Sequence, residues 1–278
     1  MTDAVEFTVL LPVTRPPATL DFAIGSVLAQ TEPRFELMVV CDGAPAETAE
    51  CAREFAARDP RVRVHAFAKG ERNGEAHRDT VLRQARGRHV AQIGDDDLWF
   101  PGYLAELGRL LRDVDFGNLP QPELKEDGGI FVHRGDLGLA YWRDRMLSEP
   151  FNFFGPTFAG YRLAAYRSLD IGWSPAPAGL PTDLHMWRKF LARSDLRFGT
   201  RMAIEGVKMS ASLRAGMSLE RRRLENARML ALVGDAGWRA DFRAQALRRC
   251  CDWGAPSPGG RLRAWRSRLY SLMQGSRT

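Results

Sequence analysis

The sequence Ile93-Gly94-Asp95-Asp96-Asp97-Leu98-Trp99 places three consecutive carboxylates directly after the apolar run at residues 89–93. Such a run is typical of a buried strand, and three unpaired negative charges at its end are costly to leave without partners. A bound cation would relieve that cost. Carboxylate oxygens suit Mg²⁺ or Mn²⁺, which also take waters and substrate phosphates as ligands. The alternative is a solvated acidic turn that caps a helix beginning near Pro101, since aspartate favours turns and helix starts.

The bulk composition is that of an ordinary globular protein. The chain has 278 residues, of which 45% are hydrophobic and 27% charged, enough for one large domain or two closely merged ones. No run approaches the ~20 apolar residues of a transmembrane helix. The first apolar run, residues 7–11, is short and follows acidic residues, unlike a signal peptide. We therefore expect a soluble cytoplasmic protein. The alternative is a protein attached peripherally to the inner face of the membrane.

The charge is concentrated in the last part of the chain. Residues 219–278 hold 13 arginines against 5 acidic residues, so this tail carries +8 while the whole chain carries +6. The remainder is therefore slightly acidic, and the basic excess belongs to the tail. The four cysteines, Cys41, Cys51, Cys250 and Cys251, show no C-x-x-C spacing, so we expect them to be reduced and structural.

Residues up to about 93 alternate short apolar runs with helical patterns, which indicates β-α-β units and a mainly parallel sheet. The expected strands are 7–11, 35–41, 62–67 and 89–93, and the expected helices include 20–28, 46–58 and 75–85. Ligands bind outside the carboxyl ends of such strands, so residues 12–15, Asp42 and residues 95–97 should converge on one site. The chain has neither G-x-G-x-x-G after the first strand nor G-x-x-x-x-G-K-[ST], which argues against a dinucleotide Rossmann enzyme and a P-loop ATPase.

The second half is less regular. We expect a polar loop at residues 117–127 between two halves, a strand pair at 129–133 and 137–142, a short helix at 163–169, a helix from Pro181, strands at 196–198 and 202–209, and up to three helices from Leu219. The expected organisation is a first half at 1–117, a second half at 118–215, and a basic helical extension at 216–278.

Four motifs in a fixed order give the chain a family resemblance. They are TVLLPVTR at residues 8–15, AIGSVLAQT at 23–31, FELMVVCDG at 35–43 and GDDDLW at 94–99. With these motifs the chain resembles a family 2 glycosyltransferase of the GT-A fold, over roughly residues 7–210. The resemblance implies an α/β fold with a Rossmann-like, mainly parallel sheet and helices on both faces. It also implies metal-dependent, inverting transfer of a hexosyl group from a nucleoside diphosphate sugar, a UDP-sugar in our expectation, to an acceptor hydroxyl.

The resemblance also implies that the half at 1–117 binds the nucleotide-sugar and that the half at 118–215 of the same GT-A domain binds the acceptor. It further implies site residues. Those for the nucleotide-sugar are Pro12, Thr14, Arg15, Asp42, Arg78, Asp95 and Asp96; those for Mn²⁺ or Mg²⁺ are Asp96 and Asp97. The sequence departs from the family pattern at three positions. Cys41 precedes Asp42 in place of a second acidic residue, Asp79 replaces a frequent Asn, and Gly94 stands where an Asp is common. Alternatives from the residues alone are a turn role for Asp42, a solvated surface charge for Arg78 and a helix-capping role for Asp97.

The implied catalytic base is Asp183, in the segment Thr182-Asp183-Leu184-His185-Met186-Trp187 at a helix start. The family has an Asp here, followed three or four residues later by an aromatic residue. The alternative is that Thr182 or Asp183 only caps the helix. His185 is a lesser candidate. The aromatic segment at residues 151–158 is expected on the acceptor side.

Two other functions are weighed against this hypothesis. A nucleotidyltransferase also needs a metal-bound nucleotide, but it commonly has a Gly- and Arg-rich loop after the first strand, and residues 12–17 contain no glycine. A non-catalytic nucleotide-sugar-binding or membrane-associated protein would use the basic tail for attachment.

The tail has its own pattern at residues 260–273. Leu262, Trp265, Leu269, Leu272 and Met273 form one helical stripe flanked by arginines. Such a helix suits an anionic membrane surface, where a lipid-linked acceptor would be found, or it packs on its own domain or on a second subunit. The expected acceptor is a cell-surface glycan or a lipid-linked molecule. A homodimer is left open, and no nucleic acid partner is expected.

Overall fold

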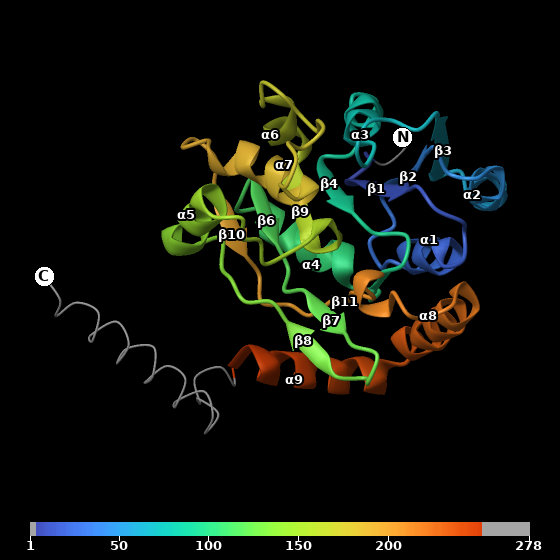
Figure 1. The fold of residues 1–278 in the computed structure, drawn as a ribbon. Helices are drawn as coiled ribbons and strands as arrows, with labels where there is room; N and C mark the ends of the chain where they lie inside the picture. The colour runs from blue at the N-terminus through green and yellow to red at the C-terminus, as the bar shows by residue number, and fades with distance from the viewer. Residues whose placement is uncertain (1–3, 252–278) are drawn as a thin grey trace, which may run out of the picture.

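The structure is a computed structural model that describes residues 4–251. Its first part alternates strands and helices as the sequence predicts. The elements are β1 (Phe7–Val13), α1 (Leu20–Leu28), β2 (Phe35–Asp42), α2 (Ala46–Arg58), β3 (Val62–Phe67), α3 (Glu75–Leu82) and β4 (His89–Gln92). The bounds of α2 and β3 match the predicted ones, and α3 ends three residues earlier than predicted (Figure 1).

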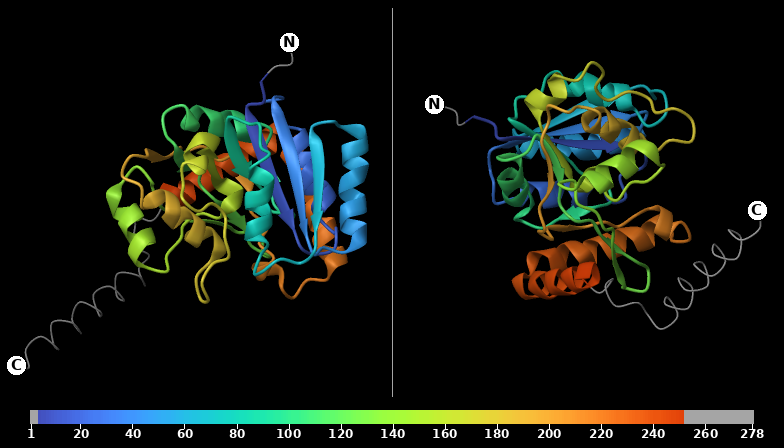
Figure 2. Two further views of the ribbon diagram at one scale, coloured as in Figure 1. Left: turned by 90° about the horizontal axis from the view of Figure 1, so that it is seen from above. Right: turned by 90° about the vertical axis from the view of Figure 1, so that its left-hand side faces the viewer.

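These strands belong to one seven-stranded sheet with the order β10-β6-β9-β4-β1-β2-β3. The three further strands are β6 (Phe116–Asn118), β9 (Ala159–Arg162) and β10 (Phe198–Thr200). Strands β3, β2, β1 and β4 run parallel, as do β6 and β10, while β9 is antiparallel to both β4 and β6. Figure 2 shows the sheet between helices on its two faces. The prediction of a mainly parallel sheet with helices on both faces is confirmed.

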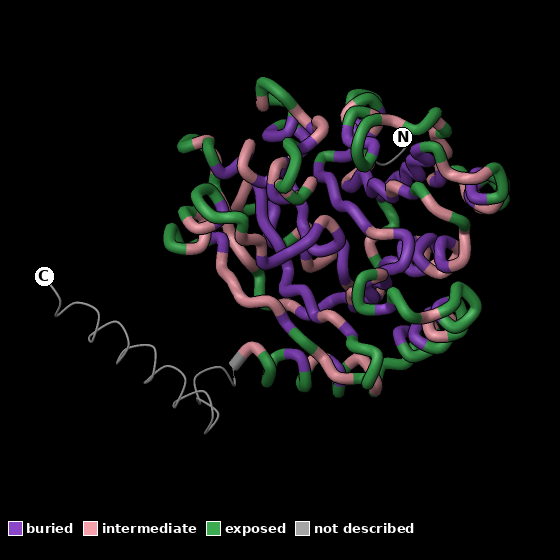
Figure 3. Tube along the Cα trace, viewed as in Figure 1, coloured by how far each residue is buried: buried purple, intermediate pink, exposed green. Residues whose placement is uncertain are grey.

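Alternating side chains of the central strands feed two separate apolar layers. Phe7, Val9 and Leu11 of β1 pack with residues of α1, α2 and α4 (Tyr103–Leu111). Leu10 faces the opposite layer, formed with α3, α5 (Ala140–Ser148), α6 (Leu163–Arg167) and α7 (Thr182–Leu191). The central strands are therefore buried on both faces, which Figure 3 shows as the continuous buried region of the molecule.

The segment at residues 117–142 differs from the prediction. The predicted polar loop contains the end of β6 and all of β7 (Pro122–Leu124), which pairs antiparallel with β8 (Ile130–Val132). The predicted strand at 137–142 is wrong, because helix α5 begins there at Ala140. In a strand, residues 137, 139 and 141 would lie on one face and share the same burial. Here Leu137 is buried, whereas Leu139 and Tyr141 are exposed.

Two further differences concern short strands. Strand β9 was not predicted; it follows the 3₁₀ helix η1 (Pro156–Phe158) directly and has only four residues. The predicted strand at 202–209 shrinks to β11 (Gly206–Val207), which pairs antiparallel with β5 (Leu98–Trp99). Strands of two to four residues are too short for a period of two to be recognised in sequence. The predicted strand at 196–198 is shifted, since β10 begins at Phe198.

After the 3₁₀ helix η2 (Ser212–Arg214), the chain forms α8 (Leu219–Gly234) and α9 (Ala236–Cys251). These helices lie together below the sheet layer (Figure 2, right). A third apolar cluster joins them to β5, β8 and the segment after β5, with Phe100, Val132, Met229, Val233 and Phe242 among its members. The predicted amphipathic segment at residues 260–273 lies outside the described residues. Within residues 4–251, every helix is too short or too polar to cross a membrane.

Candidate functional site

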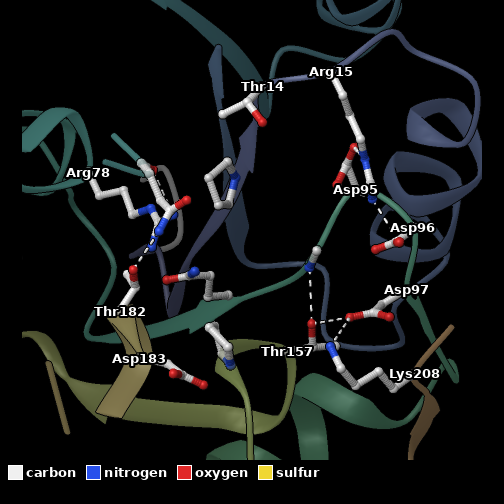
Figure 4. Close-up of a pocket in the computed structure, with 15 residues that line it drawn as sticks. Thr14, Arg15, Arg78, Asp95, Asp96, Asp97, Thr157, Thr182, Asp183 and Lys208 are labelled. Atoms are coloured by element: carbon white, nitrogen blue, oxygen red, sulfur yellow. Dashed lines mark hydrogen bonds and ion pairs between the residues drawn. The ribbon is translucent and has the colours of Figure 1, made fainter. Parts of the chain in front are cut away.

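A cavity of about 360 Å³ opens at the carboxyl ends of β1 and β4. Its lining comes from six parts of the chain, and Figure 4 shows the side chains that face it. The lining residues are Pro12, Thr14 and Arg15; Asn73 and Arg78; Gln92 and Gly94 to Asp97; Pro156 and Thr157; and Thr182, Asp183 and Lys208. All the predicted site residues except Asp42 therefore line one cavity, in the size range of small-ligand sites.

Two arginines compensate the first two carboxylates of the acidic triplet. Arg15 donates from Nε to Asp95 Oδ2 at 2.7 Å and from Nη2 to Asp95 Oδ1 at 2.8 Å, a bidentate pair. The same Nη2 lies 2.7 Å from Asp96 Oδ2, and Arg222 Nη2 of α8 donates to this oxygen at 2.9 Å. The cost of burying adjacent carboxylates is thus reduced by side chains from both ends of the chain.

Asp97 has a different environment, because protein groups bind both of its oxygens. The Thr157 hydroxyl donates to Oδ2 at 2.5 Å, and the Met209 backbone N–H donates to Oδ1 at 2.8 Å. Lys208 Nζ lies 3.6 Å from Oδ2, and the side chain of Asp97 is only 1% exposed. Asp97 therefore connects the loop after β4 to two distant segments.

The capping interpretation of the acidic turn does not hold. Helix α4 begins at Tyr103 with Gly102 as its N-cap, and no side chain of the described residues caps it. The glycine that departs from the family pattern also has a steric reason. A Cβ at Gly94 would lie 3.0 Å from Asp97 Oδ2 and 3.4 Å from Asp96 Oδ1. A side chain at Gly94 would therefore crowd the two carboxylates that follow it.

The donor set fits a divalent ion that shares its ligands with phosphates. Among residues 4–251, no three His, Cys, Asp or Glu side chains converge on a metal position. Two carboxylates, Asp95 and Asp96, nevertheless line the cavity, and Mg²⁺-type ions use one or two carboxylates with waters and substrate phosphates. Burial, together with the neighbouring charges of Asp97 and Asp95, raises the pKa of Asp96 to about 6. Repulsion between these adjacent carboxylates favours a cation beside Asp96. Asp96 is a better placed ligand than Asp97, because protein groups donate to both oxygens of Asp97.

On the opposite side of the cavity, Asp183 occupies the first turn of α7. Its Oδ1 accepts the backbone N–H of Leu184 at 2.8 Å, and its Oδ2 accepts the side-chain N–H of Asn152 at 2.9 Å. Burial raises the pKa of this carboxyl. A carboxylate with a raised pKa is a stronger base, which suits proton abstraction. His185, the lesser candidate, faces Ser174 at 3.5 Å and does not line the cavity.

Thr182 does not cap α7, whose N-cap is Pro181. Its hydroxyl donates to Glu75 Oε1 at 2.8 Å and accepts from Asn73 Nδ2 at 2.6 Å. Glu75 is fully buried and begins α3, so these bonds tie α7 to α3. The helix that carries Asp183 is thereby fixed to the helix that carries Arg78.

Arg78 is not a solvated surface charge, because its side chain is buried and the residue is 7% exposed. Its guanidinium carbon lies 4.8 Å from the ring centre of Trp173, and Nη2 donates to the Asn73 carbonyl at 3.0 Å. Its Nε has no hydrogen-bond partner among the described residues. A buried cation with an unused donor beside the cavity is suited to an anionic ligand.

Asp42 lies at the end of β2 but does not line the cavity. Lys69 Nζ contacts its Oδ2 at 2.7 Å, and the Gly70 N–H donates to its Oδ1 at 2.6 Å. Gly74 has φ of +69°, and a Cβ there would lie 2.5 Å from the carboxyl carbon of Asp42. In this structure Asp42 organises the loop before α3, and its donor role stays a prediction.

Several residues of the site were not predicted from sequence. Asn73, Gln92, Thr157 and Lys208 line the cavity, while Asn152 and Arg222 contact carboxylates of the site. Thr157 lies in the aromatic segment at residues 151–158, which was predicted to line the acceptor side. The aromatic composition of this segment therefore pointed to the right part of the chain. Lys208 and Arg222 lie far from the motifs in sequence, so no sequence pattern pointed to them.

Comparisons with known proteins show what this chain is similar to. The model of the family described as "Glycosyl transferase family 2" matches residues 8–170, more than half of the chain. A glucosyltransferase of Escherichia coli, "UDP-Glc:alpha-D-GlcNAc-diphosphoundecaprenol beta-1,3-glucosyltransferase WfgD", is 30% identical over 97 residues, which cover 35% of this chain and 37% of that protein. Alignments with the curated relatives span only 11% to 37% of their lengths.

Solved structures share the fold. The structure of Staphylococcus aureus TarS residues 1–349 with UDP-GlcNAc has a TM-score of 0.58 and 17% identity, covering 82% of this chain and 66% of that chain. The mannosyltransferase PcManGT from Pyrobaculum calidifontis, in complex with GDP-Man and Mn²⁺, has a TM-score of 0.55 and 19% identity, covering 98% of this chain and 81% of that chain. At these identities the likeness shows the fold, which is of the GT-A type.

Proposed function

Because the chain belongs to glycosyl transferase family 2, we propose that it moves a sugar from a nucleoside diphosphate sugar to an acceptor hydroxyl in the cavity between Asp183 and the acidic triplet. The observation that carries this proposal is the placement of two kinds of carboxylate on opposite sides of one cavity. Asp183 is a single half-buried carboxylate, whereas Asp95 and Asp96 are adjacent carboxylates that would bind a cation together. One side is suited to accept a proton and the other to hold a diphosphate.

Asp183 would act as the general base. The acceptor oxygen attacks the anomeric carbon, its proton passes to Asp183 Oδ2, and the bond from that carbon to the diphosphate oxygen breaks. Attack from the face opposite the leaving group inverts the anomeric configuration. The hydrogen bonds from Leu184 and Asn152 fix the carboxylate in place, and its raised pKa increases its basicity. A positioned base of this kind contributes about 10² to 10⁴ in rate.

The diphosphate would lie at the other side, near Arg15, Asp95, Asp96 and Lys208. Asp96, with Asp95, would hold Mn²⁺ or Mg²⁺, which when bound supplies Lewis-acid stabilisation of the departing diphosphate. Arg78, with its unused Nε, would contact the nucleotide or its phosphates. Pro12 and Thr14 line the wall of the cavity that follows β1 and complete the proposed donor site.

For the donor we propose a UDP-sugar. The names of WfgD and of the TarS complex contain UDP-Glc and UDP-GlcNAc, and these names support that choice. PcManGT is described with GDP-Man, so a guanosine donor is the competing choice. For the acceptor we propose a hydroxyl of a cell-surface glycan or of a lipid-linked molecule, because the name of WfgD contains a diphosphoundecaprenol acceptor.

The test is a screen of nucleoside diphosphates and their sugars, each with Mn²⁺, with Mg²⁺ or with EDTA. A ligand present at 100 times its dissociation constant stabilises the folded state by about 2.7 kcal/mol and raises the unfolding temperature. We expect UDP and a UDP-sugar to raise it, and EDTA to reduce both the shift and the slow hydrolysis of the donor. If no nucleotide raises the unfolding temperature and no donor is hydrolysed, the proposed function is wrong.

A further inference from the structure

Arg222 comes from the first C-terminal helix, α8, and ends on the acidic triplet 126 residues before it in sequence. Its Nη2 donates to Asp96 Oδ2 at 2.9 Å, and the residue is only 9% exposed. Its Nε has no hydrogen-bond partner among the described residues. A buried guanidinium whose one ion pair in the described part of the chain is with Asp96 depends on that negative charge to offset its desolvation.

The contact uses an oxygen that is already occupied. Asp96 Oδ2 also lies 2.7 Å from Arg15 Nη2, and a carboxylate oxygen has two lone pairs. Both positions on Oδ2 are therefore taken by guanidinium groups. A divalent ion would bind at about 2.0–2.1 Å from its ligand oxygen and would repel a guanidinium at hydrogen-bond distance from the same carboxylate.

The two arginines are not equally free to leave. Arg15 is held by its bidentate pair with Asp95, at 2.7 and 2.8 Å, and can stay there without Asp96. Within residues 4–251, Arg222 forms an ion pair with Asp96 alone. Helix α8 itself is held independently, because Arg223 pairs with Asp21 at 2.7 Å and Met229 and Val233 pack in the third apolar cluster. Displacement therefore requires a movement of one side chain and not of the helix.

From this geometry we propose that Arg222 is a built-in counter-cation of Asp96 that a divalent metal ion must displace, so that the two compete for one carboxylate. The inference rests on the proposed function, because it takes Asp96 as the metal ligand. It adds a residue of the C-terminal helices to the determinants of metal affinity. Because binding couplings are reciprocal, removal of Arg222 should tighten metal binding by the same factor by which metal weakens the Arg222 contact.

The test measures Mn²⁺ binding to the full chain without nucleotide, from the electron paramagnetic resonance signal of free Mn²⁺. We expect Arg222→Met to lower the Mn²⁺ dissociation constant about fivefold or more, within the usual range of binding couplings. Arg223→Met is the matched control, since Arg223 is the next residue of α8 and pairs with Asp21 instead; its Mn²⁺ affinity should match that of the wild type. Asp96→Asn should remove the binding in either background. Equal or weaker Mn²⁺ binding by Arg222→Met, or no binding by any form, overturns the proposal.

A second measurement uses the unaltered chain, in case Arg222→Met does not fold. Phenylglyoxal modifies arginines that are free of a carboxylate partner, and mass spectrometry locates the modified residue. Saturating Mn²⁺ should increase the modification of Arg222 severalfold and leave Arg223 unchanged, whereas no increase at Arg222 contradicts the competition. If the wild type hydrolyses a nucleotide-sugar while both readouts are negative, only the competition fails. If both readouts are positive and no nucleotide binds, the proposed function fails instead.

Discussion

Substitution Asp183→Asn separates proton transfer from binding. The amide keeps the size of the carboxylate and an oxygen for the Leu184 N–H, but it cannot accept the acceptor proton. Its NH₂ would face the Asn152 side-chain NH₂, which now donates to Asp183 Oδ2 at 2.9 Å, so one amide has to turn over. That rearrangement changes one hydrogen bond, worth about 0.5–1.5 kcal/mol in folding stability.

The catalytic loss should be larger than this structural cost. Loss of a general base worth 10² to 10⁴ in rate corresponds to about 2.7–5.4 kcal/mol in the activation barrier, at 1.36 kcal/mol per factor of ten. Asp183 lies across the cavity from Asp95 and Asp96, so donor and metal affinity should stay unchanged. The expected result is therefore a fall in kcat of two to four orders of magnitude, with a wild-type dissociation constant for the nucleoside diphosphate and a similar unfolding temperature.

The assay measures nucleoside diphosphate release by a coupled enzyme reaction, calorimetry for ligand binding and thermal unfolding for stability. Asp21→Asn is the control, because Asp21 also lies in the first turn of a helix, α1, but does not line the cavity. It should keep full activity. A kcat of Asp183→Asn within about tenfold of the wild type would remove Asp183 from the chemistry.

Three other results are expected. The proposed base, Asp183, must be ionised to accept a proton, and burial raises its pKa above the ordinary aspartate pKa of 3.8. We therefore expect kcat/KM to begin to fall at a pH above 3.8 as the pH is lowered. A kcat/KM that stays constant down to pH 3.8 would contradict this. Thr157→Val removes the hydroxyl between Asp97 and the Gly94 N–H and should lower the free energy of unfolding by about 1–3 kcal/mol in urea titration, whereas an unchanged midpoint would show that water replaces it. Trp187→Ala empties a position that is 0% exposed in the second apolar layer and should cost about 3–5 kcal/mol by the same titration, and a loss under 1 kcal/mol would refute that packing.

The first half of the fold could be predicted because its signals are local and long. Strands β1 to β3 have six to eight residues each, and the helices between them present an apolar face with recognisable breaks such as Asp59-Pro60. The second half is built from strands of two to four residues, whose pairing is decided by tertiary contacts. Strand β9 lies antiparallel between β4 and β6, and its Gly160 lies against Leu107 of α4, a fit that no local pattern contains.

The site shows the same division. Residues at the carboxyl ends of the parallel strands, such as Arg15 and Asp95 to Asp97, could be located because a parallel sheet brings these ends together. Asp42 meets this condition too, yet Lys69 and Gly70 hold its carboxylate outside the cavity lining. Lys208 and Arg222 reach the triplet from segments with no motif, and only three-dimensional packing brings them there.

The hydrogen bond between Thr182 and Glu75 limits how the two halves of this protein can be recombined. It joins the first residue of α7 to the first residue of α3, with Asn73 as a third member. A chimera that keeps residues 1–117 and takes a second half without a hydroxyl at this position would leave Oε1 of the fully buried Glu75 without its donor, with only the Asn73 backbone N–H still bound to Oε2. Exchanges of the second half should therefore keep a threonine at position 182, so that the proposed base, Asp183, stays fixed relative to α3.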